Sequence, residues 1–156
     1  MKITIVSGRS GSGKTVILNV LEDLGYYCID NLPIGLLTDL SKKIDPNHTN
    51  VAVSLDVRNF PREFKNFEEI IDSLKQSYDH SEIIFIDANN KTLISRFNET
   101  RRRHPLSTKT IGLREALRIE TKILRPLTDI ADMLIDTSYL NAHDLKDLIH
   151  KRLNQH

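Results

Sequence analysis

The chain has 156 residues, of which 39% are hydrophobic and 28% are charged, so it is long enough for one domain with a full-sized core. Its net charge of +1 excludes a global electrostatic attraction to nucleic acid or to a membrane surface. The single cysteine, Cys28, excludes an internal disulfide and favours a reducing compartment, and no apolar stretch approaches the ~20 residues of a membrane span. We therefore expect a cytoplasmic protein with no membrane partner.

Short apolar runs alternate along the chain with stretches whose apolar residues recur at helical spacing. The runs predict five strands, at residues 3–7, 26–30, 51–57, 82–87 and 132–136. The helical spacing predicts helices at 15–24, from Pro33 through Leu40, at 61–78, 91–102 and 113–124, and from Asn141 onward. Pro46 is expected to break the chain after the second of these helices, and Pro126 to end the fifth.

The order of these elements predicts the fold class. Continuously apolar strands that are separated by helices are typical of a parallel sheet with both faces covered. We therefore predict an α/β fold with a five-stranded parallel sheet and helices on both faces, in an order that suits nucleotide kinases. No repeat or interior linker interrupts the pattern, so residues 1–156 are expected to form one domain.

The segment GRSGSGKT, at residues 8–15, matches the phosphate-binding loop pattern of a glycine, four residues and then Gly-Lys-Thr. It follows a predicted strand and opens a predicted helix, as a P-loop NTPase requires. Glycines let backbone N–H groups curl toward a phosphate, and the N-terminal end of the helix adds a positive field. Lys14 adds a charge for the β- and γ-phosphates, and the Thr15 hydroxyl can bind Mg²⁺. The predicted phosphate-contacting residues are Gly8, Arg9, Ser10, Gly11, Ser12, Gly13, Lys14 and Thr15.

A phosphate loop that holds Mg²⁺ also needs a carboxylate nearby. Four predicted strands have an aspartate as their last or last but one residue, and ligands of open α/β sheets bind beyond the carboxyl ends of the strands. Asp56 ends the apolar run VAVSLD and is the first choice, so we predict that it binds the metal with Thr15 and that it is catalytic together with Lys14. Asp30 and Asp87 are the second-line alternatives.

Basic residues gather between Arg96 and Arg125, a segment that contains nine Lys or Arg residues and only three Glu. The run Arg101–Arg102–Arg103 lies there in a predicted loop that continues into His104 and Pro105. A mobile arginine-rich loop can close over a transferring phosphate, or it can bind the phosphates of RNA. Both interpretations remain open, although the shortage of aromatic side chains argues against base stacking.

Four segments together resemble the N-terminal half of the RapZ-type (YvcJ-like) RNase adapter proteins, which are bacterial P-loop proteins. The segments read GRSGSGKT, YYCIDNLP, SLDVRN and TRRRHPLS, and the resemblance extends over essentially the whole chain. It implies binding of ATP and GTP with slow hydrolysis. It also assigns nucleotide contacts to the phosphate loop and to a second segment, which consists of Asp56, Val57, Arg58 and Asn59.

The resemblance also implies a second domain of similar size, which is absent from this chain and to which binding of small RNA and of an RNase is largely ascribed. We therefore expect the chain to be a fragment. An oligomer is compatible with the sequence.

Three functions fit these observations. The first is an ATP- and GTP-binding domain with weak NTPase activity, serving as the regulatory half of an RNase adapter in small-RNA-linked control. The second is a small-molecule or nucleotide kinase that transfers the γ-phosphate of ATP, with Asp30 and Asn31 holding the acceptor. The third is an RNA-binding module in which the nucleotide is only structural.

Overall fold

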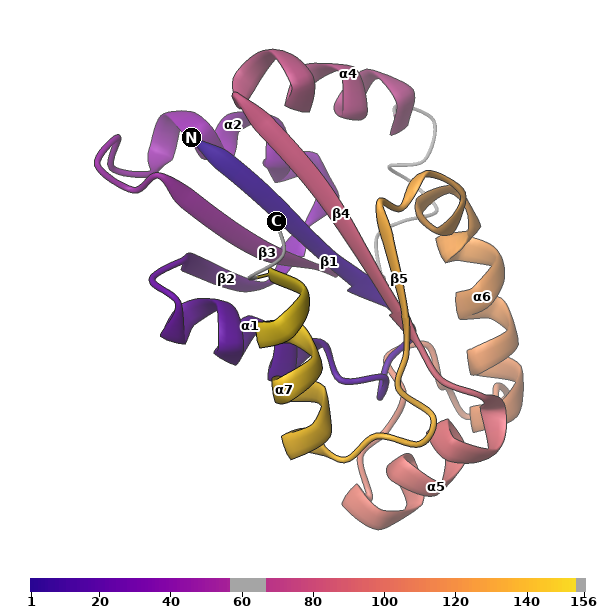
Figure 1. The fold of residues 1–156 in the computed structure, drawn as a ribbon. Coiled ribbons are helices and arrows are strands. Elements are labelled where there is room, and N and C mark those ends of the chain that lie inside the picture. The colour runs from indigo at the N-terminus through magenta and orange to yellow at the C-terminus, as the bar shows by residue number, and fades with distance from the viewer. Residues whose placement is uncertain (57–66, 154–156) are drawn as a thin grey trace.

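Five parallel strands form the centre of the fold (Figure 1). The structure is a computed structural model that describes residues 1–56 and 67–153. The strands lie in the order β2-β3-β1-β4-β5, so β1 is central and β5 is at an edge. Their bounds are β1 Lys2–Gly8, β2 Tyr27–Pro33, β3 Asn50–Asp56, β4 His80–Asp87 and β5 Met133–Asp136.

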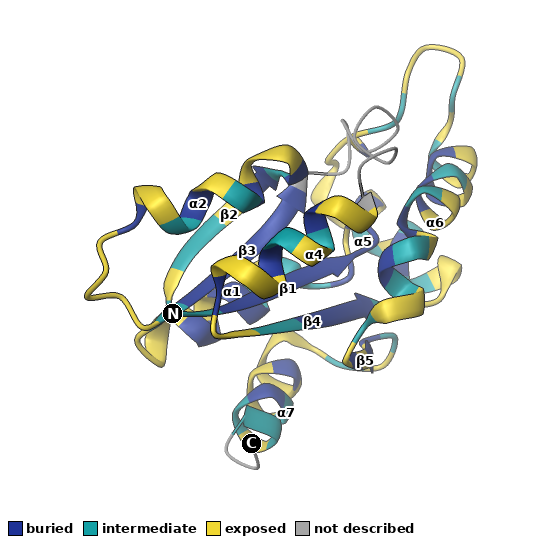
Figure 2. Ribbon diagram, turned by 90° about the horizontal axis from the view of Figure 1, so that it is seen from above, coloured by how far each residue is buried: buried dark blue, intermediate teal, exposed yellow. Residues whose placement is uncertain are grey.

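Helices cover both faces of this sheet, which confirms the predicted fold class. Because successive residues of a strand point to opposite faces, Ile5 of β1 packs into one hydrophobic cluster and Val6 into another. Figure 2 shows the result as buried central strands beneath helices with exposed outer faces. The Val6 side is covered by α1 (Lys14–Asp23) and α7 (Ala142–Leu153), and the Ile5 side by α2 (Leu37–Lys43), α4 (Phe67–Ser77) and α6 (Leu113–Ile130).

One helix lies beyond the sheet rather than on it. Figure 1 shows α5 (Asn90–Thr100) past the carboxyl ends of the strands. Its Leu93 and Phe97 are buried against Leu117 of α6, which fixes it at the edge where a ligand of an α/β sheet is expected. No helix in the described part of the chain is both long and apolar enough to cross a bilayer.

Two proline predictions were wrong. Pro126 lies inside α6, which continues to Ile130, because Leu124 and Leu127 are buried on the same helix face and their packing favours continuation over the missing backbone bond. Pro33 is the last residue of β2 and is followed by the short 3-10 helix η1 (Ile34–Leu36) before α2 begins. Leu36, which lies within the range predicted to be one helix, is the last residue of η1 and is exposed.

The strand register places the phosphate loop between β3 and β4. β1 pairs with both strands, and its last residue, Gly8, lies opposite Ile86 of β4. A Cβ atom on Gly8 would lie 2.0 Å from the Ile86 carbonyl oxygen, and the φ angle of Gly8 is +152°. Only glycine therefore allows β1 to turn into the loop at this point.

We predict that Gly8→Ala lowers the free energy of unfolding by about 3 kcal/mol, because it adds a backbone clash to an unfavourable φ angle. Urea unfolding monitored by circular dichroism measures this change. Gly112→Ser is the matched control, since a Cβ atom there meets no atom within 4 Å and the φ angle is −79°. A loss of stability in Gly8→Ala no larger than in the control would contradict the prediction.

Candidate phosphate-binding site

The loop between β1 and α1 has the backbone of an anion-binding turn. Gly11 and Gly13 adopt φ angles of +87° and +113°, and α1 begins at Lys14, directly after Gly13. The φ angle of Gly13 favours glycine, and a Cβ atom there would lie 2.9 Å from Cδ2 of Leu145 on α7, which would have to shift. The turn aims the N-terminal end of α1 at the space above the loop, as the sequence pattern predicts.

Several backbone donors of this loop are left for a ligand. Among the described residues, the N–H groups of Gly11, Gly13 and Thr15 have no hydrogen-bond acceptor. The Thr15 hydroxyl likewise forms no hydrogen bond within the described part of the chain, and Thr15 is exposed. Donors clustered at a helix N-terminus favour an anion, and a hydroxyl beside them suits a cation that accompanies it.

The loop is held through its carbonyl groups instead. The guanidinium of Arg96 on α5 donates to the Gly11 carbonyl oxygen at 3.0 Å, and the Thr137 hydroxyl after β5 donates to that of Ser12 at 2.7 Å. Arg96 also donates to the Thr137 carbonyl oxygen at 2.6 Å, so the two anchors are linked. Within the loop, the Ser12 N–H donates to the Arg9 carbonyl oxygen at 3.2 Å.

A buried carboxylate provides the remaining support. The Glu120 carboxylate on α6 accepts the Ser10 N–H at 2.9 Å and the Ser10 hydroxyl at 2.7 Å. It also lies 2.9 Å from Nε2 of His104, which belongs to the basic loop between α5 and α6. The side chains of Glu120 and His104 both have 0% exposure. The phosphate loop and the basic loop therefore meet at a common, fully buried group.

A hollow of about 530 Å³ lies over the phosphate loop. The phosphate loop lines it with Lys14 and Thr15, and the basic loop lines it with Arg102 and Arg103. Cations from two separate segments suit a polyanion, and the volume is within the usual size of a small-ligand site. Further lining residues are Val16, Arg96, Phe97, Glu99, Thr100 and Pro105.

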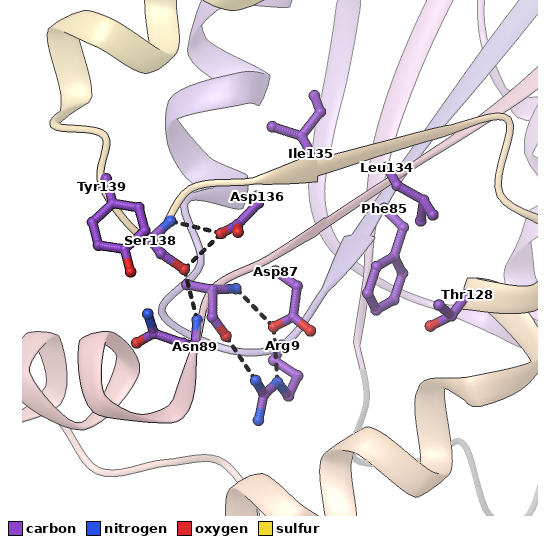
Figure 3. A pocket seen from close by; sticks show the side chains of 11 residues that line it. Arg9, Phe85, Asp87, Asn89, Thr128, Leu134, Ile135, Asp136, Ser138 and Tyr139 are labelled. Atoms are coloured by element: carbon purple, nitrogen blue, oxygen red, sulfur yellow. Dashed lines mark hydrogen bonds and ion pairs between the residues drawn. The ribbon is translucent and has the colours of Figure 1, made fainter.

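The structure places the Arg9 side chain away from this hollow. Its guanidinium donates to the Asp87 carboxylate at 2.8 Å, to the Ala88 carbonyl oxygen at 2.7 Å and to the Asn90 side chain. Figure 3 shows Arg9 and Asp87 together in a second hollow, of about 570 Å³, at the ends of β4 and β5. Arg9 therefore takes part in the phosphate loop through its backbone, while its side chain ties the loop to β4.

The second hollow is a poor site for phosphate. It is lined by two carboxylates, Asp87 and Asp136, and the guanidinium that it contains is already paired with Asp87. Hydrogen bonds from the Ser138 hydroxyl and N–H lower the pKa of Asp136 below its ordinary value, which keeps this carboxylate ionised. Of the two hollows, the one over Lys14 has the charge that a nucleotide needs.

Two of the other predicted site residues, Asp30 and Asp56, belong to the neighbouring strands β2 and β3. Asp56 is the last residue of β3, and the predictions for its carboxylate and for Val57, Arg58 and Asn59 lie outside the described part of the chain. Asp30 is exposed at an irregularity of β2, where it accepts a hydrogen bond from Ser54 of β3.

The sequence did not predict the roles of Arg96, Glu120 and Thr137 in holding the phosphate loop. Arg96 was counted in the basic segment, but its guanidinium is occupied by backbone carbonyls and a hydroxyl. Glu120 left a visible signal, because it lies at helical spacing between Leu117 and Leu124 on the buried face of α6. A charged residue on such a face requires buried partners.

Comparisons with known proteins agree with this geometry. The family model described as the RapZ-like N-terminal domain matches residues 1–156. A nucleotide-binding protein from Pseudomonas paraeruginosa is 47% identical over 157 residues, covering 98% of this chain and 55% of the relative. One from Pseudomonas fluorescens (strain SBW25) is 48% identical over 158 residues with the same coverage. The chain thus spans about half the length of the curated relatives that it matches.

Solved structures with the same fold include small-molecule kinases. A gluconokinase from Sinorhizobium meliloti has a TM-score of 0.64 at 16% identity, covering 97% of this chain and 91% of its own. A shikimate kinase from Acinetobacter baumannii, in complex with shikimate, has a TM-score of 0.64 at 19% identity, covering 98% and 93%. At these identities the likeness shows a shared fold.

Proposed function

The chain belongs to the family of RapZ-like N-terminal domains, and from this premise we propose that it binds the nucleoside triphosphates ATP and GTP together with Mg²⁺ in the hollow over the phosphate loop. The observation that carries the proposal is that the N–H groups of Gly11, Gly13 and Thr15 have no acceptor among the described residues and that Arg102 and Arg103 line the same hollow. Fixed donors of this kind bind phosphate oxygens without having to reorganise.

Each group in the hollow has a distinct part in this proposal. The loop N–H groups bind phosphate oxygens, and Lys14 adds a point charge beside the β- and γ-phosphates. The Thr15 hydroxyl and the Asp56 carboxylate are the proposed ligands of Mg²⁺, which when bound neutralises phosphate charge. Arg102 and Arg103, which line the same hollow, stabilise charge from the basic loop.

We expect turnover to be slow. Glu99 is the only carboxylate among the described residues that line the hollow, and no described histidine lines it. Efficient hydrolysis needs a group that orients or deprotonates the attacking water. The arrangement therefore supports a nucleotide-binding regulatory domain with weak ATPase and GTPase activity.

We assign the wider role to the longer proteins of the family. In this proposal the domain is the regulatory half of a cytoplasmic RNase adapter in small-RNA-linked control. Small RNA and the RNase bind mainly through the part that the longer relatives have in addition. Nucleotide binding in this half would then be the signal that the other half transmits.

Lys14→Ala should weaken the binding of ATP and GTP at least tenfold, about 1.4 kcal/mol, because it removes the cation on the loop side of the hollow. Calorimetric titration measures both affinities. The control is Lys75→Ala, which removes the same charge from the exposed side of α4. Wild-type affinity in a folded Lys14→Ala protein would contradict the proposed site.

Asp56→Asn should weaken only the Mg²⁺-dependent part of nucleotide binding and should abolish turnover, because the loop donors that bind the phosphates stay in place. Asp87→Asn is the comparison, since the Asp87 carboxylate is already paired with Arg9. The measurement is the ATP affinity with Mg²⁺ and with EDTA. If Asp87→Asn shows the metal-specific loss and Asp56→Asn does not, the assigned carboxylate is wrong.

A kinase activity is the second candidate function, and the geometry of β2 favours it. The register of β2 shifts between Ile29 and Leu32, Asn31 has a φ angle of +63°, and the exposed Asp30 is held by Ser54. Residues in sparsely populated backbone conformations cluster at functional sites. Asn31 is such a residue, and it lies near the carboxyl end of β2, where ligands of α/β sheets bind. An acceptor bound by Asp30 and Asn31 would face the phosphate loop across the edge of the sheet.

The two functions differ in how ATP consumption responds to an acceptor. A coupled assay of ADP release with gluconate, shikimate or a nucleoside monophosphate should show less than a twofold change in rate if the domain is regulatory. Stimulation of more than tenfold by one acceptor, lost in Asp30→Asn, would favour the kinase. The same assay without protein controls for contaminating ADP.

A further inference from the structure

The Glu120 carboxylate is buried and has no lysine or arginine partner among the described residues. Its side chain has 0% exposure, and within the described part of the chain it is bonded to the Ser10 N–H, the Ser10 hydroxyl and Nε2 of His104. Burying a carboxylate is costly unless donors compensate for the lost water. The position is therefore sustained only while both Ser10 and His104 stay where they are.

The hydrogen bonds also show which ring nitrogen of His104 carries the proton. Its Nδ1 accepts the N–H of Leu106 at 3.0 Å, so Nδ1 carries no proton. The ring proton is then on Nε2 and is donated to Glu120 at 2.9 Å, and the imidazole is neutral. The Ser107 N–H donates to the His104 carbonyl oxygen at 2.9 Å, and the ring of Phe97 lies with its centroid 5.5 Å from that of His104.

The arginines of the basic loop are attached to this anchor. Arg102 and Arg103 directly precede His104, are exposed, and line the same hollow as Lys14. Neither guanidinium forms an ion pair or hydrogen bond with a described residue, so the positions of these residues depend on the backbone that His104 holds. An anchored backbone lowers the entropy that is lost when the arginines bind an anion.

We propose that Glu120 and His104 are positioning residues that couple the phosphate loop to the arginine loop, so that Arg102 and Arg103 are held over the phosphates that the loop binds. This inference rests on the proposed nucleotide binding. According to this inference, two buried residues control the affinity for a triphosphate although they do not line the hollow. In this arrangement neither the phosphate loop nor the basic loop can move far without breaking a hydrogen bond to Glu120.

Two substitutions of Glu120 separate the effect of its hydrogen bonds from the effect of filling its buried position. Glu120→Gln keeps an oxygen that can accept from Ser10 and His104 and adds an N–H donor for the Ser10 hydroxyl, so ATP affinity should stay within about threefold of wild type. Glu120→Leu leaves all three donors without an acceptor, and affinity should fall at least tenfold. Glu115→Leu, on the exposed face of the same helix, is the matched control and should bind as wild type.

The decisive measurement is a double-mutant cycle with Arg102→Ala/Arg103→Ala, using ATP as the probe and calorimetry for affinity. If Glu120 acts through the arginines, Glu120→Leu should cost less than threefold in the background that lacks them, because their contribution is already gone. Thermal unfolding of every variant verifies the fold. Should Glu120→Leu not fold, His104→Phe keeps the ring and removes both bonds, and we expect the same pattern from it.

Three results would overturn the inference. An equal loss in both backgrounds would show that Glu120 only supports the phosphate loop, and unchanged affinity in Glu120→Leu would show that no coupling is needed. Either result, obtained while Lys14→Ala still weakens ATP binding, leaves the proposed function intact. Wild-type protein that binds ATP no better than Lys14→Ala would instead remove the proposed function, and the coupling with it.

Discussion

Backbone N–H groups that are reserved for a ligand cannot also hold the loop that carries them. The phosphate loop of this protein is consequently fixed from outside, through two of its carbonyl groups, Ser10 and the side chain of Arg9. Arg96 binds the Gly11 carbonyl, Thr137 binds that of Ser12, and Glu120 binds Ser10. Donors that have no acceptor among the described residues therefore require anchors elsewhere in the loop. This combination suits the preorganised anion site that we propose.

The anchors explain why the elements beyond the sheet matter. Arg96 comes from α5, Glu120 from α6, and Thr137 from the segment between β5 and α7. These elements converge because β1 is central and α5 packs on α6 past the ends of the strands. The same packing brings the loop with Arg102 and Arg103 to the hollow. The elements α5, α6 and the segment after β5 therefore complete the fold and also fix the conformation of the phosphate loop.

Local patterns predicted the fold and the phosphate loop, because alternation of apolar runs and the spacing of GRSGSGKT are visible in neighbouring residues. Long-range partners were not visible. The bonds from Arg96 to Gly11 and from Glu120 to Ser10 span 85 and 110 residues. The sequence therefore suggested that Arg96 was available to a ligand, although its guanidinium is bonded to backbone carbonyl groups. It also predicted that α6 ends near Pro126, although the buried residues around Pro126 keep the chain helical to Ile130.

The most direct test of the account is a crystal structure of the protein with Mg²⁺ and a non-hydrolysable ATP analogue. We predict that the phosphates lie against the N–H groups of Gly11, Gly13 and Thr15, with Arg102 or Arg103 on the opposite side and Glu120 still bonded to Ser10 and His104. Phosphates bound elsewhere, for example beside Asp87 and Asp136, or a Glu120 carboxylate released from Ser10, would contradict it.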